Sequence, residues 1–189
     1  MPATPRRITL IRHAEKPDEK NPEQLPHGMT ENGEIQPTSL TVRGWQRAGG
    51  LAVVFGPPHD QPSPPHMRPT VLYAPAYPDG LTHRPTETIT PLSRRLGLTI
   101  QAPVPKGAEA ALVTEHLLGQ ADQDVLVCWE HHHLPAIAAA LAGAVHVSAS
   151  APNATLWPDD DFSSALVYTR NGDGVYALAQ VKVAVLDGD

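Results

Sequence analysis

The sequence has few of the features that tie a chain to a disulfide framework or to a membrane. It contains one cysteine, Cys128, so a disulfide cannot form within the chain. It has no apolar run near the roughly 18 residues of a membrane-spanning helix. Its first residues contain an apolar core of only four residues, which is too short for a signal peptide. We therefore expect a cytoplasmic protein with no membrane partner.

Positive charge is also in short supply. The chain has 14 lysines and arginines against 20 aspartates and glutamates, a formal net charge of −6. An acidic protein is repelled by nucleic acids and anionic membranes, so we expect neither as the main partner. If the substrate is an anion, a local basic pocket has to overcome this overall charge.

Common cofactor motifs are absent. The sequence has neither a P-loop nor a G-x-G-x-x-G segment, so nucleotide binding by those routes is unsupported. His131 and His133 would share one face of a strand, but no cysteine or carboxylate at ligand spacing accompanies them. The expectation is a protein with no metal and no cofactor.

Proline is abundant. The 21 prolines in 189 residues are about twice the usual share of roughly 5%. Most lie between segments with regular hydrophobic spacing, which indicates long ordered loops, the longest of them at residues 14–39 and 56–69. The length suits one domain spanning residues 1–189.

Hydrophobic spacing predicts alternating strands and helices. Short apolar runs predict strands at 8–13, 70–75, 97–103 and 124–130. Helical spacing predicts helices at 39–55, 84–96, 107–119 and 134–143. Thr41 is a plausible N-cap of the first helix, Gly97 ends the second, and Pro91 is expected to kink or split that second helix. Two runs joined by Asn-Gly-Asp-Gly, at 164–170 and 175–186, predict a C-terminal hairpin. This order indicates an α/β protein with a mixed sheet.

Cationic and imidazole side chains lie where these strands end. Arg12 and His13 close the first strand, His131 follows the strand at 124–130, and Arg84 opens the helix after the second strand. Ligands of such sheets bind at the carboxyl ends of the parallel strands. Guanidinium groups donate hydrogen bonds to phosphoryl oxygens. A neutral imidazole can attack phosphorus and carry the phosphoryl group as a covalent intermediate. The pattern predicts a phosphoryl-transfer site.

Four segments extend this pattern to a family. "LIRHAEKP" (10–17) resembles the Arg-His-Gly/Ala signature of the histidine phosphatase superfamily, the phosphoglycerate mutase-like proteins. "LTVRGWQRA" (40–48), "RPTET" (84–88) and "VLVCWEH" (125–131) resemble three further segments of that family, in the family's order. The resemblance spans residues 8 to about 142.

The resemblance carries implications for fold and site. It implies a three-layer sandwich with a mostly parallel mixed central sheet and the C-terminal hairpin. It implies His13 as the nucleophile, a phosphate pocket of Arg12, His13, Arg84 and His131, and no metal. Two departures stand out: Glu130 occupies a position where the family has a small or hydroxylated residue, and the segment before Arg84 is longer than usual.

The proton donor is open at this stage. The family supplies it from a carboxyl group, and Glu109 is nearest to the usual position. His132, Glu15 and Glu130 are the alternatives. His27 and His83 are expected in loops, where either could reach the pocket mouth, and Asp159-Asp160-Asp161 is expected to be a solvated turn.

The predicted function is metal-independent hydrolysis of a phosphomonoester, or of a phosphorylated protein side chain, through a phosphohistidine at His13. A mutase of the phosphoglycerate mutase type is less favoured, because no segment matches the frame that would retain the product. A protein that binds a phospho-ligand without turning it over is the other alternative. The sequence identifies neither the substrate nor the oligomeric state.

Overall fold

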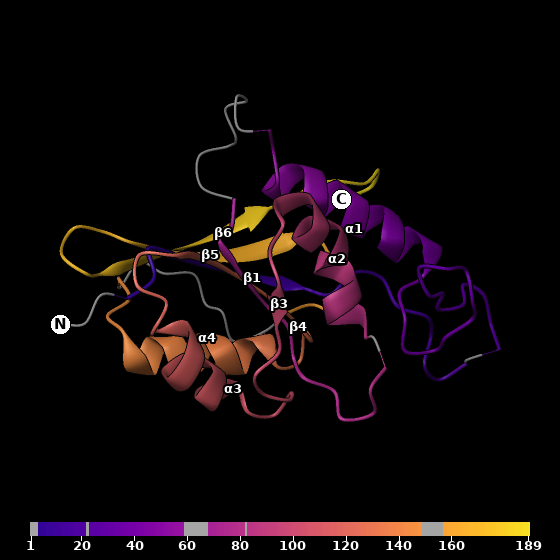
Figure 1. Cartoon of the computed structure of the whole chain (residues 1–189), viewed down its shortest axis with the longest axis horizontal. Helices are drawn as coiled ribbons and strands as arrows, with labels where there is room; N and C mark the ends of the chain where they lie inside the picture. The colour runs from indigo at the N-terminus through magenta and orange to yellow at the C-terminus, as the bar shows by residue number, and fades with distance from the viewer. Residues whose placement is uncertain (1–3, 22, 59–67, 82, 149–156) are drawn as a thin grey trace.

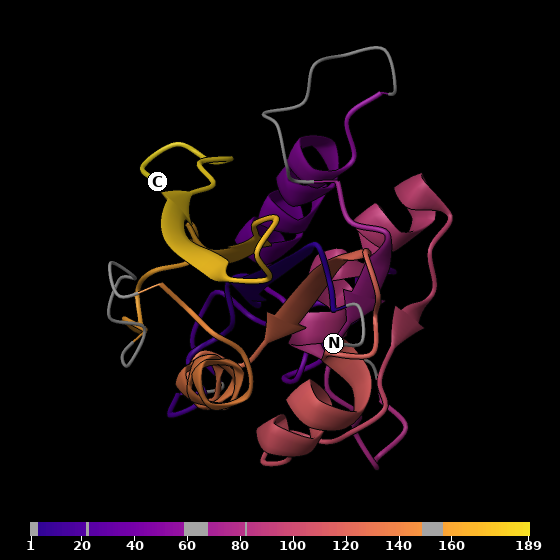
Figure 2. The same ribbon diagram turned by 90° about the vertical axis from the view of Figure 1, so that its left-hand side faces the viewer.

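A computed structural model describes residues 4–21, 23–58, 68–81, 83–148 and 157–189. Within these ranges no helix combines the length and the apolar character needed to cross a bilayer. The predicted α/β class is confirmed: a six-stranded mixed sheet lies between two layers of helices (Figures 1 and 2).

The sheet has the strand order β3-β2-β4-β1-β5-β6. Strands β1, β2, β3 and β4 run parallel, whereas β5 pairs antiparallel with both β1 and β6. The strands are β1 (Arg7–Arg12), β2 (Val71–Tyr73), β3 (Ile100–Gln101), β4 (Asp124–Trp129), β5 (Ser164–Arg170) and β6 (Tyr176–Lys182).

The two central strands explain where the site forms. All six residues of β1 and all six of β4 are buried, as expected of strands covered on both faces. Arg12 lies opposite Trp129 in the β1–β4 register. The residues that follow these strands, His13 and His131, therefore emerge at the same edge of the sheet.

Each face of the sheet is covered by helices (Figures 1 and 2). Helices α1 (Val42–Phe55) and α2 (Arg84–Leu96) pack on one face, around Phe55, Leu72 and Ile89. Helices α3 (Glu109–Ala111) and α4 (Leu134–Ala144), with the π-helix η1 (Leu112–Leu117), pack on the other face around Trp129 and Leu141.

Two helix ends follow their predicted signals. The side-chain oxygen of Thr41 accepts a hydrogen bond from the backbone N–H of Gly44, which caps α1. Gly97 adopts the left-handed conformation, with φ of 68°, and ends α2.

Pro91 was expected to kink or split the second helix, and the split is wrong, because α2 runs through Pro91 without a break. An interior proline costs about 3 kcal/mol. On either side of it, Ile89 and Leu92 are fully buried, and burying two such side chains contributes roughly 3 to 6 kcal/mol. Tertiary packing therefore offsets the local cost.

Three other elements differ from their predicted form. The helix predicted at 107–119 is a single α-turn followed by the π-helix, whose wider turns keep Leu112, Val113 and Leu117 buried. The strand predicted at 97–103 is reduced to Ile100–Gln101, and the second hairpin strand ends at Lys182.

Candidate active site

His13 lies in the turn that leaves β1, and backbone contacts fix that turn. The backbone N–H of His13 donates to the carbonyl oxygen of Trp129, at 3.0 Å. The next N–H, of Ala14, donates to Oγ1 of Thr88 at 2.9 Å, and that hydroxyl donates to the carbonyl oxygen of Arg84 at 2.7 Å. The end of β1 is thus tied to β4 and to the first turn of α2.

The imidazole of His13 has one free nitrogen. Nδ1 lies 2.8 Å from the carbonyl oxygen of Ala14, which can only accept, so Nδ1 carries the proton and Nε2 has the lone pair. Nε2 is buried and has no hydrogen-bond partner. Burial, together with the charges of Arg12 and Arg84, lowers the pKa of His13 to about 3, although the bond to Ala14 opposes the change. The ring is neutral at physiological pH.

Arg12 is buried under the segment that precedes β5. Its Nη1 donates to the carbonyl oxygens of Pro158 and Asp159, and its guanidinium carbon lies 3.8 Å from the centre of the Phe162 ring. Burial lowers the pKa of Arg12 to about 10, although Asp159 and Glu130 oppose the change, so Arg12 remains a cation. Its Nε is buried without a partner.

Arg84 is the first residue of α2. Its Nη1 donates to Glu19 at 2.6 Å and its Nη2 to the carbonyl oxygen of Pro37 at 3.0 Å, while Nε is buried without a partner. Burial alone would raise the pKa of Glu19, but hydrogen bonds from Lys16 and Arg84 lower it to about 2. The Glu19 carboxylate is therefore ionised.

His131 follows β4 and is almost fully buried. Its ring centre lies 6.0 Å from that of His13, and the two planes meet at 80°. Its Nε2 lies 2.9 Å from Oδ1 of Asp159, and its Nδ1 is buried without a partner. Burial and the charge of Arg12 lower the pKa of His131, and the bond to Asp159 opposes them.

The four predicted pocket residues thus share one property. Each has a buried nitrogen with no hydrogen-bond partner in the described part of the chain: Nε of Arg12, Nε2 of His13, Nε of Arg84 and Nδ1 of His131. Buried polar atoms nearly always have a partner, and each exception calls for an explanation. A bound anion with several oxygens would supply one.

Glu109, the predicted proton donor, has its own set of partners. Its carboxylate accepts from the indole of Trp129 at 2.9 Å and from the backbone N–H of Gly107 at 2.8 Å, and it lies 3.0 Å from Nδ1 of His133. Burial would raise the pKa of Glu109, but these donors lower it. The contacts favour the ionised form.

The alternative donors differ in how they are held. Glu15 is paired with Arg47 and Arg43, and His132 is exposed with its ring 3.9 Å from that of His131. Oε2 of Glu130, by contrast, is buried without a hydrogen-bond partner.

One group in the described residues could supply three metal ligands. Ligand atoms of Glu130, His131 and His132 lie within 4.8 Å of one another. The rings of His131 and His132 have their centres 3.9 Å apart and their planes inclined by 37°. Burial and the positive charge of Arg12 lower the pKa of His131, and the same charge would repel a metal ion. A metal-free site stays a prediction.

Two residues beside the site were not singled out from the sequence. Asp159 was expected in a solvated turn, yet its carboxylate contacts His131. Tyr77 stacks on His83 with ring centres 3.7 Å apart. Burial raises the pKa of Tyr77 to about 12, and the nearby charges of Arg84 and Glu130 also act on it. The one available signal was that Tyr77 is the sole aromatic residue in the long segment before Arg84.

The fold is of the phosphoglycerate mutase-like class that the motifs predict. Among solved structures, the putative phosphohistidine phosphatase SixA from Agrobacterium tumefaciens superposes with a TM-score of 0.54. The match covers 97% of this chain and 100% of that chain at 16% sequence identity, which shows a shared fold. No family model and no curated protein matches the sequence. Membership of the histidine phosphatase superfamily stays a prediction from the motifs.

Proposed function

We propose that this protein is a phosphatase that transfers a phosphoryl group from its substrate to Nε2 of His13 and then to water. The observation that carries the proposal is the free, buried and unprotonated Nε2 of His13, together with the partnerless nitrogens of Arg12, Arg84 and His131, three residues whose charges act on His13. A nucleophile and three donors for phosphoryl oxygens are the groups that this reaction requires.

The first step is an in-line displacement at phosphorus. The lone pair of Nε2 forms the N–P bond while the bond from phosphorus to the leaving oxygen breaks. The proton on Nδ1 stays on its bond to Ala14, which holds the ring in the attacking orientation. Arg12 and Arg84 stabilise the negative charge on the equatorial oxygens. In the second step water attacks phosphorus and the N–P bond breaks. Inorganic phosphate is released, and His13 is neutral again.

His131 supplies a donor when both of its nitrogens carry a proton. Nε2–H then donates to the ionised Asp159, and Nδ1–H faces the phosphoryl group. A bound dianion favours this protonated form, since an opposite charge nearby raises the pKa of an imidazole.

We propose Glu130 as the proton donor to the leaving oxygen. A general acid needs an oxygen that is free to meet the leaving group, and Oε2 of Glu130 is buried without a hydrogen-bond partner, with Nε2 of His133 at 3.9 Å. The electrostatic influence of Glu130 on both Arg12 and His131 puts it beside the pocket. Glu109, the choice from the sequence, has a lowered pKa and three donors of its own, so it suits the role less well.

The proposed substrates are phosphomonoesters and phosphorylated protein side chains. The name of the SixA structure refers to phosphohistidine, and a phosphorylated imidazole is one such side chain. An imidazole leaving group would use the same nucleophile and the same oxygen-binding donors.

The test is hydrolysis of p-nitrophenyl phosphate in the presence of a chelator. The wild type should turn it over, and a quench at alkaline pH should trap radiolabelled phosphate on His13. His13→Ala should abolish both. His146→Ala, which alters an exposed histidine, should abolish neither.

Two outcomes would contradict the proposal. A wild type that binds phosphate without hydrolysing any ester would favour a phospho-ligand-binding protein. Turnover that survives in folded His13→Ala would exclude the phosphohistidine route.

A further inference from the structure

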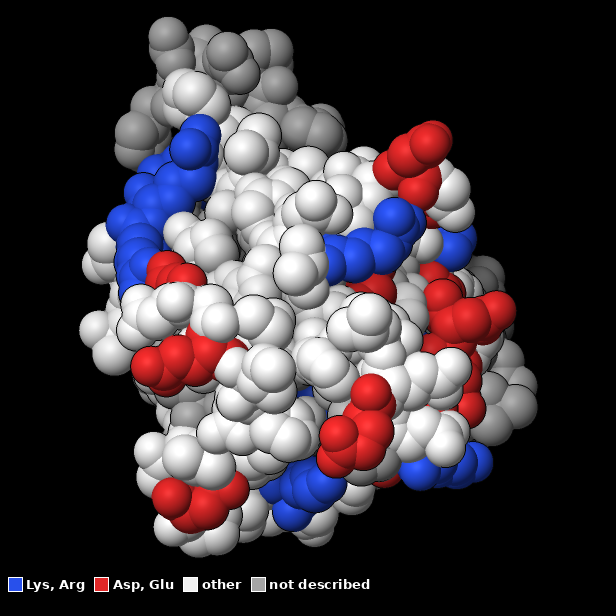
Figure 3. All heavy atoms as spheres, turned by 90° about the vertical axis from the view of Figure 1, so that its right-hand side faces the viewer, with Lys and Arg blue, Asp and Glu red and all other residues white. Residues whose placement is uncertain are grey.

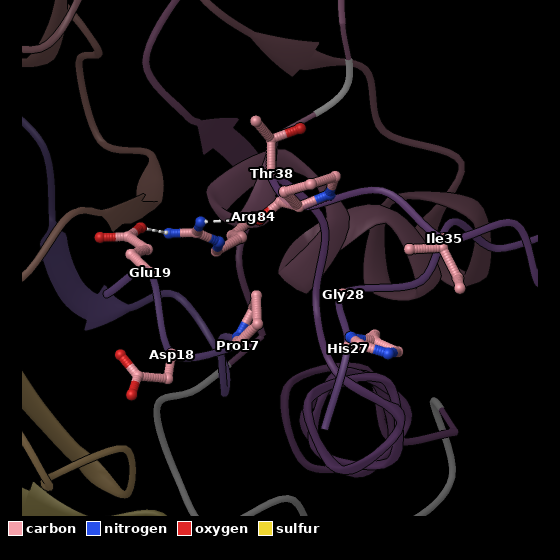
Figure 4. Close-up of a pocket in the computed structure, with 9 residues that line it drawn as sticks. Pro17, Asp18, Glu19, His27, Gly28, Ile35, Thr38 and Arg84 are labelled. Carbon is pink, nitrogen blue, oxygen red and sulfur yellow. Dashed lines mark hydrogen bonds and ion pairs between the residues drawn. The ribbon is translucent and has the colours of Figure 1, made fainter. Parts of the chain in front are cut away.

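A cavity of about 260 Å³ adjoins Arg84 on the side of the loop that follows β1 (Figure 4). It lies between two limbs of that loop, residues 17–19 and 27–38. Its lining is Pro17, Asp18, Glu19, His27, Gly28, Ile35, Pro37, Thr38 and Arg84. The sequence singled out Arg84 as a site residue and His27 as a possible residue of the pocket mouth, and it placed substrate specificity in the loops at 14–39 and 56–83 without naming the other lining residues.

Hydrogen bonds hold the walls of this cavity in place. The backbone N–H of Gln36 donates to the carbonyl oxygen of Gly28 at 2.9 Å, and a Cβ at Gly28 would collide with the carbonyl oxygen of Gln36. Ser39 and Leu40 both donate to the buried carboxylate of Glu87 on α2. The wall is therefore anchored to the same helix that carries Arg84.

The cavity and the reaction centre share Arg84. The charge of Arg84 acts on His13, and its guanidinium lines the cavity. Oγ1 of Thr38, on the cavity wall, is buried without a partner, as is Nε of Arg84. A phosphoryl group held by Arg84 would thus lie beside this space.

Size and polarity limit what fits. Pockets for drug-sized ligands have volumes of about 300 to 1,000 Å³, so about 260 Å³ suits a single ring or one amino-acid side chain. Pro17, Ile35 and Pro37 give the walls an apolar surface.

Among the charged residues that line the cavity, Asp18 and Glu19 are negative and Arg84 is positive, and Lys16, outside the lining, pairs with Glu19 at 3.0 Å. Glu19 is ionised and points at Arg84, while Asp18 points away from it (Figure 4). Acidic side chains also separate the basic ones on the face shown in Figure 3, so its described part has no broad positive patch. A second anionic group on the substrate would meet these carboxylates.

We infer that this cavity is the leaving-group subsite, and that it selects substrates whose leaving group is compact, apolar and free of further negative charge. The inference rests on the proposed function for the identity of the phosphoryl site. It excludes bisphosphates, nucleotides and phosphorylated carboxylic acids as preferred substrates.

Binding of non-hydrolysable arylphosphonates tests the charge selection without relying on turnover. 4-Carbamoylphenylphosphonate and 4-carboxyphenylphosphonate have nearly the same shape and differ by one charge. Calorimetry should give the wild type a dissociation constant about fivefold lower for the carbamoyl compound. Glu19→Gln should reduce that ratio at least about twofold, whereas Glu34→Gln, an exposed acid of the same loop outside the cavity, should leave it unchanged.

A second pair of phosphonates tests the contribution of the apolar wall to binding. Phenylphosphonate should bind about tenfold more tightly than methylphosphonate, because the ring is removed from water. Ile35→Ser should lower this ratio. Val53→Ser, at an exposed position of α1, should not change it.

Equal binding of the carbamoyl and carboxy compounds, or a ratio insensitive to Glu19→Gln, would overturn the subsite, and so would the absence of phosphonate binding. Phosphohistidine formation at His13 in the same preparation would leave the proposed function standing in that case. Selective phosphonate binding without any hydrolysis would reject the phosphatase and retain the subsite.

Discussion

At the scale of single residues, the proposed chemistry depends on which side-chain atoms carry a proton and which are free. The carbonyl oxygen of Ala14 keeps the proton of His13 on Nδ1, so Nε2 is ready to attack. Two carboxyl groups beside the site differ in their contacts. Oε1 of Glu109 accepts from the Trp129 indole and from the backbone N–H of Gly107, whereas Oε2 of Glu130 has no hydrogen-bond partner. Burial by itself therefore does not identify the acid, because the contacts of each carboxyl group decide which oxygen is free to meet the leaving group.

This difference predicts a leaving-group effect. Glu130→Gln should reduce kcat/KM for phenyl phosphate by about a hundredfold or more, because phenolate is a basic leaving group that needs a proton. The loss should be far smaller for p-nitrophenyl phosphate, whose leaving group departs as the anion. Steady-state kinetics on the two esters measures the ratio.

Glu109→Gln is the matched comparison, since it also keeps the size of the side chain. It should affect both esters alike. If the selective loss on phenyl phosphate appears in Glu109→Gln and not in Glu130→Gln, the acid is the residue expected from the sequence and our assignment is wrong.

At the scale of elements, the segment before β5 covers one side of the site. Its backbone oxygens at Pro158 and Asp159 accept from Arg12, Phe162 lies against the same guanidinium, and the Asp159 carboxylate contacts His131. A segment near the C-terminal hairpin therefore helps to position two residues that belong to β1 and to the turn after β4.

The contact between Asp159 and His131 predicts a change in pH dependence. Asp159 raises the pKa of His131, so Asp159→Asn lowers it, and the doubly protonated ring is lost at a lower pH. The basic limb of the kcat/KM profile should move to lower pH, and activity near neutrality should fall about two- to fivefold, since Asp159 is largely exposed. Asp160→Asn, a neighbouring exposed acid, should leave the profile in place, and an unchanged profile in Asp159→Asn would remove Asp159 from this role.

At the scale of the whole molecule, one buried arginine joins three distant parts of the chain. Arg47 on α1 donates to Glu15, two residues after His13, and to Asp189 at the far end of the sequence, with distances of 2.9 and 2.6 Å. The Asp189 carboxylate also accepts from two backbone N–H groups near it. The turn that carries the nucleophile is thus braced against α1 and the residues after β6.

Breaking this cluster should destabilise the fold. Arg47→Met leaves the Asp189 carboxylate without its cation and Glu15 with only the exposed Arg43, and should lower the free energy of unfolding by about 3 to 5 kcal/mol. Arg43→Met removes an exposed arginine that pairs with the same Glu15, and should cost no more than about 1 kcal/mol. Urea unfolding measures the loss of stability in both variants. Equal losses would show that the buried cluster stabilises the fold no more than the exposed pair does.

Much of the fold could be predicted from the sequence because its signals are local. Apolar runs predicted β1 and β4, Thr41 and Gly97 marked helix ends, and Asn-Gly-Asp-Gly marked the hairpin. The continuity of α2 through Pro91 and the π-helix were not predictable in this way, since both depend on burial against other elements. The single domain over residues 1–189 stays a prediction.

The sequence by itself determined which residues come to the carboxyl edge of the sheet. Arg12, His13 and His131 follow directly from the ends of two strands, and Arg84 from the start of a helix, because strand direction and residue spacing place them there. Only the tertiary structure decided the contacts of those residues. It leaves one nitrogen of His13 free, brings Asp159 to His131, and places Arg84 against Glu19 and beside the cavity. Asp159 is 28 positions from His131 and Glu19 is 65 positions from Arg84, and hydrogen bonds between residues so far apart have no signature in local sequence spacing, because they form only when the packed elements bring the atoms together.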